Sequence, residues 1–379
     1  MPEQNSIRRE NTFLRDCTRY FLQPGGSVSI PQGLDWIQFL ALAKEHSVEP
    51  AIYSVLRDQA LPEGAGNELG ASFHRTARAN LALTAGLVKL LALFEQGRID
   101  VLTLKGPVLA EALYGSIALR TFSDLDLLVR PADVLRAKSL LESHGYAATT
   151  TPHWRSDRAY LRSRDSQISF AGADGASVDI HWRLLPDYFP KAVDENRVWS
   201  SRRAVTIGGA AAWTLSPEHL LMFLCAHGTK HLWERLGWIA DVARLLQVEK
   251  NIDWSYVFAE ADRTYTSRLL SLGLLLSSDL SGFAAPERAR SDQNAALLAD
   301  WIRRRFMNSD PIPASTLKTA WFSTRVFERR GQRLRYALEL FFGPTEADYR
   351  ALPLPPSSHA FYYIFRPLRL GARAVGLGR

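Results

Sequence analysis

Three aspartates occur at a spacing that suits the binding of divalent metal ions. Asp124 and Asp126 are one residue apart in the segment DLDLLVR, and Asp179 lies in the segment VDIHW. Side chains two residues apart on a β-strand point to the same face, so Asp124 and Asp126 are expected side by side. Carboxylates this close repel one another unless a cation lies between them, and Mg²⁺ takes carboxylate oxygens as ligands. Two adjacent acids and a third from a neighbouring strand suit a two-metal site for phosphoryl or nucleotidyl transfer.

A phosphate-binding element is expected beside these acids. Gly106 ends a short β-rich segment and begins a helix, which lets the main chain approach an anion at the helix N-terminus, and Lys105 adds positive charge. Gly115 is a second candidate, but its place at the end of the same helix favours a C-cap. Arg120 and Ser123 directly precede the acids and could contact phosphate oxygens.

Several histidines extend this set. His181 shares a strand face with the third aspartate, and either contacts substrate or is a hydrogen-bonded structural residue. His227 and His231 are four residues apart in a predicted helix, with Lys230 beside them and Asp241 in the next helix. Three interpretations stay open for this group: a zinc site, a structural polar cluster, and contacts to a base or phosphate where two domains meet.

Other catalytic signatures are missing from the sequence. There is no GxxxxGK[ST] or GxGxxG phosphate loop and no readable Ser-His-Asp arrangement, which argues against P-loop kinases and dehydrogenases. Four tryptophans could stack on a base, although their helical spacing favours a place in the core: Trp154, Trp182, Trp233 and Trp238.

The elements that must position the acids alternate in period. Apolar residues follow a strand pattern at 99–106 and 124–130, with a helix between them at 107–115 and another that ends at Gly145. Two hairpins are expected at 166–184, which turns at residues 173–175, and at 204–215, which turns on Gly208 and Gly209.

The flanking regions are predicted to be helical. Apolar residues recur at spacings of three and four in the N-terminal region and again after the second hairpin. We therefore expect an α+β protein, in which a mixed β-sheet core is flanked by N-terminal and C-terminal helical regions. The predicted domains are a helical region at 1–95, an α/β core at 96–215, and a helical domain with a basic tail at 216–379.

These residues carry a resemblance. The order Lys105-Gly106, Arg120, Ser123-Asp124-Leu125-Asp126, Asp179 and His181-Trp182 resembles the nucleotidyltransferase superfamily typified by DNA polymerase beta. Within it, the chain is most similar to the uncharacterised nucleotidyltransferase family, whose signature combines LKG, a tyrosine, an arginine, DxD and a helix that ends in Gly-Tyr. The likeness covers roughly residues 95–245 and includes HGTKHLW and WIAD, which favours a substrate-facing role for the histidines and Asp241.

The resemblance implies Mg²⁺-dependent transfer of a nucleoside monophosphate from an NTP, most simply ATP, to a hydroxyl group. It implies two metal ions, with Mn²⁺ as a substitute, bound by Asp124 and Asp126, while Asp179 binds the catalytic ion and assists deprotonation of the acceptor. One feature departs from the superfamily pattern. A Gly-Gly or Gly-Ser turn is replaced by Gly106-Pro107, so one phosphate-facing N–H is missing.

Composition sets the outer limits. The 379 residues are 46% hydrophobic and 22% charged, which excludes disordered and fibrous classes. Two cysteines, Cys17 and Cys225, cannot form a disulfide framework, and the cytoplasm is the expected compartment. The N-terminus does not resemble a signal peptide, and no run reaches the length of a transmembrane span; the closest is 269–276.

The net charge of +7 has an uneven distribution. Residues 303–379 hold 14 basic and 5 acidic residues, a balance of +9, so the other 302 residues have a balance of −2. Arginines alternate with apolar residues in this region, as in a helical cap over the core or in a surface for an acidic partner, RNA or a membrane.

Three functions remain open from the sequence. The first is transfer to a small molecule, peptide or protein; the second is transfer to RNA or tRNA, as in a toxin-like enzyme; the third is a non-catalytic nucleotide-binding module.

Overall fold

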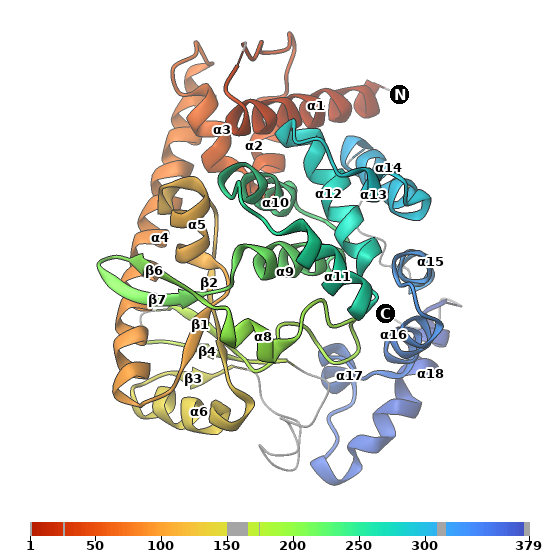
Figure 1. Ribbon diagram of the computed structural model, residues 1–379. Coiled ribbons are helices and arrows are strands. Elements are labelled where there is room, and N and C mark those ends of the chain that lie inside the picture. The colour runs from red at the N-terminus through yellow and green to blue at the C-terminus, as the bar shows by residue number, and fades with distance from the viewer. Residues whose placement is uncertain (1, 26, 150–165, 174, 309–315, 375–379) are drawn as a thin grey trace.

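The computed structural model describes residues 2–25, 27–149, 166–173, 175–308 and 316–374 (Figure 1). Its centre is a seven-stranded sheet in the order β3-β4-β5-β2-β1-β7-β6. β2 runs parallel to β5 and β1 runs parallel to β7, while the other neighbours are antiparallel. The strands are β1 (Val101–Thr103), β2 (Asp124–Val129), β3 (Ala147–Ala148), β4 (Gln167–Ala171), β5 (Ser177–His181), β6 (Arg203–Ile207) and β7 (Ala210–Thr214).

Both predicted hairpins are confirmed. β4 pairs with β5, and β6 pairs with β7 through Gly208 and Gly209, whose φ angles of +55° and +81° lie where L side chains are rarely found. The mixed sheet with helices at both ends of the chain is the α+β architecture expected from the sequence.

In the sequence, helices precede the strands, lie between them and follow them. The first four precede β1, and α5, α6 and α8 lie between strands. The long series from α9 onward follows β7. They are α1 (Pro2–Leu22), α2 (Trp36–Glu45), α3 (Glu49–Leu56), α4 (Glu63–Gln96), α5 (Gly106–Tyr114), α6 (Val134–Ser143), α8 (Glu195–Ser200), α9 (Pro217–Lys230), α10 (Leu236–Val248), α11 (Trp254–Thr264), α12 (Ser267–Ser281), α13 (Glu287–Arg290), α14 (Gln293–Asn308), α15 (Thr316–Val326), α16 (Arg330–Phe342), α17 (Glu346–Ala351) and α18 (Tyr362–Ala374).

Two hydrophobic cores lie on opposite faces of the sheet. One contains Leu125 and Leu127 of β2 with Val178 and Ile180 of β5, and packs against α4 and α6. The other joins α1 to α9, α10, α12 and α14, so the N-terminal and C-terminal helices share a single core. Figure 1 shows these helices gathered above the sheet. The division into three consecutive domains therefore stays a prediction, since the first and third predicted domains are packed together.

The helix α4 differs from the sequence expectation. Among the helices that the structure describes, it alone has the length and apolar composition needed to cross a membrane, whereas the sequence pointed to 269–276 as the closest candidate. The reason is its content of alanine and leucine between Asn80 and Gln96. Here α4 packs one face into the core through Leu87, Leu90 and Phe94.

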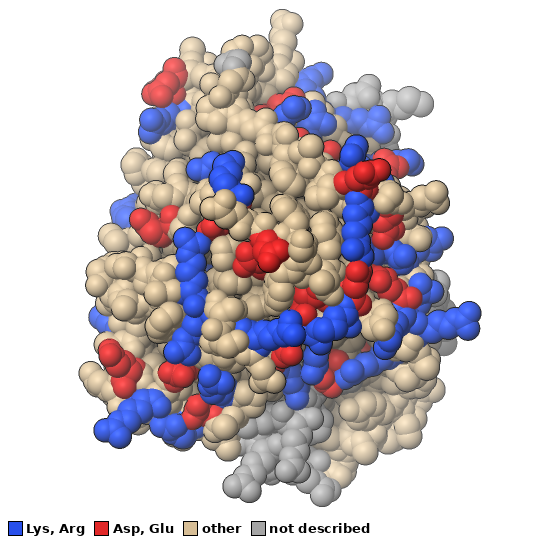
Figure 2. All heavy atoms as spheres, viewed as in Figure 1, with Lys and Arg blue, Asp and Glu red and all other residues tan. Residues whose placement is uncertain are grey.

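Several arginines of the basic C-terminal region form ion pairs with acids of this chain. Arg303 pairs with Asp279, Arg335 pairs with Asp187, and Arg366 and Arg369 both pair with the buried Asp348. Figure 2 shows basic and acidic side chains interspersed on the side where α13 to α16 lie. The large apolar side chains exposed on α16 and α18 include Leu334, Leu338, Ile364 and Leu368, the last being 66% exposed. These four arginines are thus engaged within the chain, and the role of the basic region stays a prediction.

Candidate active site

The aspartates of β2 and β5 lie in register. Asp126 is directly opposite Asp179 across the parallel strand pair, and Asp124 is opposite Ser177. The alternating Leu and Ile side chains face the core on the other side of the sheet, which fixes the acids on one face. Asp124, Asp126 and Asp179 therefore share a surface, as the period-two pattern predicts.

Asp126 is the most enclosed of the three acids. It is 5% exposed, accepts a hydrogen bond from His181 Nε2 at 3.0 Å, and forms an ion pair with Lys105 Nζ at 3.0 Å. Burial alone would raise the pKa of the Asp126 carboxyl, but the charge of Lys105 and the hydrogen bond from His181 outweigh it. The pKa is held well below its usual range, so Asp126 is ionised.

The other two acids differ from Asp126. Burial, followed by the charge of Asp126, raises the pKa of Asp124, and no hydrogen bond or ion pair to its carboxylate occurs within the described ranges. Asp179 accepts a hydrogen bond from Gln167 Nε2 at 2.6 Å. The acids thus combine one fixed anion with two carboxylates whose remaining oxygens can bind a ligand.

The donor set fits a divalent cation. One ligand atom each from Asp126, Asp179 and His181 lie within 4.8 Å of one another, and in the described part of the chain no other group of three such side chains does so. Two carboxylates with an imidazole beside them suit a divalent metal ion. The structure thus brings Asp126 and Asp179 together as expected and adds His181 to them, while Asp124 lies next to them along β2.

Gly106 and Gly115 have the two different places that the sequence suggests. Gly115 ends α5 with φ +70°, and its N–H donates to the carbonyl of Glu111, so it is a C-cap. Gly106 begins α5 with φ +66°, and a Cβ atom there would lie 3.4 Å from the main-chain oxygen of Asp124. Gly106 therefore allows α5 to begin directly beside β2, with Lys105 reaching Asp126.

Arg120 and Asp241 bind each other. Nε and Nη2 of Arg120 donate to the two carboxylate oxygens of Asp241, each at 2.9 Å, and the hydroxyl of Tyr114 donates to the same carboxylate at 2.8 Å. Asp241 is 2% exposed. Asn80 Nδ2 donates to the main-chain oxygen of Arg120 at 2.8 Å. This cluster joins α4, α5 and α10 at the loop that leads into β2.

The ion pair with Asp241 makes Arg120 a structural support of the site. Arg120 also lies near the acids of β2. The charge of Arg120 is one of the influences that lower the pKa of Asp124. Contact of Arg120 and Asp241 with nucleotide stays a prediction, and it requires the buried pair to open or to present an outer edge.

The histidine helix faces the acids through Lys230. The rings of His227 and His231 are 4.7 Å apart, and Trp238 lies 5.2 Å from each. Burial, then the charge of Lys105, lowers the pKa of Lys230 to about 8, while Asp126 and Asp179 act in the opposite direction. Burial lowers the pKa of His231 to about 3 and places that of His227 well below its usual range, so both rings are neutral. They form an uncharged aromatic wall beside a lysine.

This arrangement bears on the zinc interpretation. The acid that would complete a zinc site, Asp241, is engaged with Arg120. The ring contacts of His227 and His231 with Trp238 leave a structural role and a base-contacting role open.

Some supporting residues went unnoticed in the sequence. Gln167 is opposite His181 in the β4–β5 hairpin and holds Asp179. Counting the register back from the predicted turn would have found it. Tyr114 is the tyrosine between LKG and Arg120 in the family signature, but its bond to Asp241 was not foreseen. Asn80 had no such signal, because it meets the main chain of Arg120 through the packing of α4. Of the tryptophans, Trp182 and Trp233 are core residues, and Trp154 lies outside the described residues.

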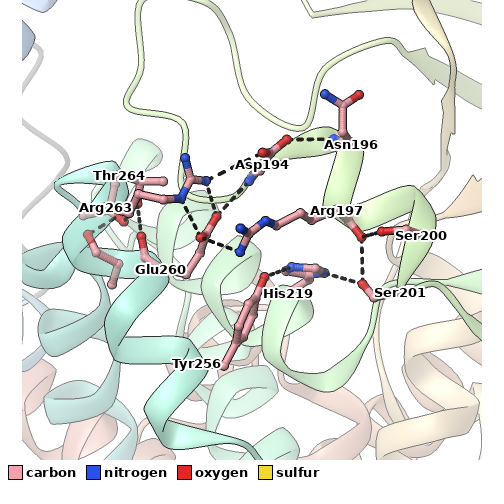
Figure 3. A network of polar contacts seen from close by, with 12 residues as sticks. Asp194, Asn196, Arg197, Ser200, Ser201, His219, Tyr256, Glu260, Arg263 and Thr264 are labelled. Atoms are coloured by element: carbon pink, nitrogen blue, oxygen red, sulfur yellow. Dashed lines mark hydrogen bonds and ion pairs between the residues drawn. The ribbon is translucent and has the colours of Figure 1, made fainter.

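A separate polar network braces the base of α9 (Figure 3). His219 of α9 bonds Ser201 through Nδ1 at 3.0 Å and the hydroxyl of Tyr256 in α11 through Nε2 at 2.6 Å. Glu260 of α11 binds Arg263 and the N–H of Asp194, which caps α8. The network ties the first turn of α9 to α11 and to the residue that follows α8.

Comparison with known proteins identifies the family. The family model described as "Uncharacterised nucleotidyltransferase" matches residues 32–282, about two thirds of the chain. The chain therefore belongs to this nucleotidyltransferase family. The match includes β1, β2, β5, α9 and α10, which carry the acids, Lys105 and the histidine wall. No curated protein matches the chain.

Proposed function

We propose that this protein is an active, metal-dependent nucleotidyltransferase, which transfers a nucleoside monophosphate from an NTP, with ATP as the simplest donor, to a hydroxyl group of a small molecule, peptide or protein in the cytoplasm. The observation that carries the proposal is the register that sets Asp126 opposite Asp179. Asp126 is also held by an ion pair with Lys105 and a hydrogen bond from His181. Two carboxylates held at this spacing, with Asp126 kept ionised, suit metal-dependent phosphate chemistry better than a solvated strand face.

Asp124, Asp126 and Asp179 would hold two Mg²⁺ ions, or Mn²⁺ in their place, and the bound ions would neutralise the charge that develops on the phosphates. Lys105 at the start of α5 and Lys230 at the end of α9 add further positive charge. The uncharged wall of His227, His231 and Trp238 offers a surface on which a base could stack. Ser123 and Gly106 complete the phosphate-facing edge.

In the reaction, the acceptor hydroxyl gives its proton to Asp179, and its oxygen forms a bond to the α-phosphorus. The bond between the α-phosphorus and the oxygen that bridges to the β-phosphate breaks, and pyrophosphate leaves with that electron pair. The residues of this chain contribute orientation and charge: Lys105 keeps Asp126 ionised, and Gln167 orients Asp179.

The test uses ATP labelled at one phosphate at a time. With Mg²⁺ and a metabolite extract, label from α-³²P ATP should appear in a product, and label from γ-³²P ATP should appear in pyrophosphate. Transfer of the γ-label to an acceptor would show a kinase instead. Binding of ATP without any transfer, across extracts and with Mn²⁺ as well, would favour the non-catalytic module, for which Gly106-Pro107 is the supporting feature.

A further inference from the structure

A cavity of about 570 Å³ lies next to the loop that leads into β2 and its acids. Its walls come from the α2–α3 loop, α4, the loop that leads into β2, the α9–α10 loop and α14. It thus connects the N-terminal and C-terminal helices at the edge of the site. The residues that line it include Lys44, His46, Arg75, Ser123, Arg235 and Arg305.

The cavity is built around positive charge. Lys44, Arg75, Arg235 and Arg305 line it, against three glutamates. Arg305 is buried, and its Nη2 donates to the main-chain oxygens of Leu232 at 2.8 Å and Trp233 at 3.0 Å, so its position is fixed. One glutamate, Glu49, is itself bound by the hydroxyl of Ser72. A guanidinium group held in this way suits an anionic ligand group.

Two polar atoms of the wall lack partners. Nδ1 of the buried His46 and the hydroxyl of Thr121 have no hydrogen-bond partner within the described ranges. Burial lowers the pKa of His46 to about 4, so the ring is neutral. Unmet hydrogen-bonding capacity of this kind is uncommon in packed cores and indicates a wall that a polar ligand can rearrange to meet.

Two residues connect the cavity to the acids and to the aromatic wall of His227, His231 and Trp238. Ser123 lines the cavity and directly precedes Asp124. Arg235 lines the cavity and also lies 5.5 Å from the Trp238 ring, which packs on His227 and His231. A molecule in the cavity therefore lies next to the loop that leads into Asp124.

We infer that this cavity binds the acceptor, and that the acceptor is a small hydroxyl compound with an anionic group, either a phosphate ester or a carboxylate. The inference rests on the proposed function. The volume is that of a small-molecule site. Arg305, which is held in place, supplies recognition of the anion together with Lys44, Arg75 and Arg235, while the hydroxyl points to Asp124 and its neighbours.

The test measures binding of two simple probes to the full chain without nucleotide or metal. By calorimetry, glycerol 3-phosphate or glycerate should bind, and neutral glycerol should bind at least tenfold more weakly. Arg75→Ala and Arg235→Ala should each weaken binding of the anionic probe about tenfold. Both arginines are exposed, so both variants should fold. Arg78→Ala, one turn along α4 and outside the cavity, is the matched control and should bind as the wild type does.

A competition step separates the cavity from the nucleotide site. A non-hydrolysable ATP analogue with Mg²⁺ should leave probe binding in place, and Asp126→Asn should bind the probe normally. Absence of binding by both anions, equal binding of glycerol, or displacement by the analogue would overturn the inference. Transfer of the α-label without probe binding would remove only the cavity assignment, whereas probe binding without any transfer would remove only the proposed function.

Discussion

Asp126 and Asp179 occupy directly opposed positions on the parallel strands β2 and β5, so their carboxylates emerge from the same face of the sheet at the distance of neighbouring strands. This relationship depends on the core beneath it, because a slip of one residue in either strand would turn its acid into the hydrophobic layer. The same register places His181 next to Asp179, within hydrogen-bonding distance of Asp126.

His181 is expected to orient Asp126 for metal binding. His181→Ala should weaken Mn²⁺ binding by about 10-fold to 100-fold, the usual loss when a group that positions a metal ligand is removed. His181→Gln should recover part of the affinity, because its amide can donate to Asp126. Electron paramagnetic resonance titration with Mn²⁺, followed by Mg²⁺ competition, measures both. A changed ratio of Mg²⁺ to Mn²⁺ affinity in the Ala variant, with no recovery by Gln, would instead make His181 a direct ligand.

Arg120 is expected to matter first for stability. Arg120→Ala leaves the buried carboxylate of Asp241 without its cation and should cost about 3–5 kcal/mol of unfolding free energy. Denaturant unfolding measures the loss. Arg304→Ala, which removes the exposed pair with Asp300, is the control and should cost no more than about 1 kcal/mol. Wild-type stability of Arg120→Ala, together with a raised KM for ATP, would show that Arg120 serves the nucleotide instead.

Acid should destabilise the fold through its buried neutral histidines. The pKa of His46 is about 4 in the folded chain, below the ordinary value of 6.5, so between these values the unfolded chain binds the proton and the folded chain does not. Stability therefore falls as the pH decreases from about 6.5 to 4 and levels off below, with His46 contributing about 3 kcal/mol at roughly 1.4 kcal/mol per unit.

His46→Gln should flatten this part of the stability profile, measured as the unfolding midpoint in denaturant between pH 7 and pH 4. The exposed His74 provides the control, since His74→Gln should leave the profile unchanged. An identical slope in wild type and His46→Gln would contradict a neutral His46 in the folded chain.

RNA binding through the basic C-terminal region is expected to be weak. Arg303, Arg304, Arg335, Arg366 and Arg369 are paired with acids of this chain, which leaves these five arginines engaged rather than available to neutralise phosphates. The slope of log affinity against log salt for single-stranded RNA should be shallower than about −2. A slope of about −4 or steeper would mean that these pairs open on RNA, and would support the RNA-directed alternative.

The sequence predicts the elements of the site well because its signals are local. Strand alternation places Asp124 and Asp126 on one face, and the turn at Gly208-Gly209 defines its hairpin. The same alternation pairs Asp179 with His181 on one face. The third acid was expected only on a neighbouring strand, and no local signal indicates the parallel pairing of β2 with β5 that brings it to the first two.

The support of the site depends on contacts between distant parts of the chain. Arg120 meets Asp241, and Asn80 meets the main chain of Arg120, across separations that no periodicity marks. The charge pattern of the C-terminal region was informative about composition but not about pairing, because Asp187 and Asp279 come from earlier segments to meet its arginines. A local pattern identifies which residues share a face; it does not identify which faces meet.

The central claim is that the Asp126–Asp179 pair carries nucleotidyl transfer. Its most direct test is the initial rate of transfer from α-³²P ATP with Mg²⁺ for the wild type, Asp126→Asn and Asp179→Asn, beside Asp100→Asn, an acid with a 58% exposed side chain just before β1. Both site variants should lose about 10³-fold or more, the several kcal/mol of transition-state stabilisation that a metal-binding acid supports, while Asp100→Asn keeps the wild-type rate. Folded Asp126→Asn or Asp179→Asn protein that retains the wild-type rate would contradict the claim.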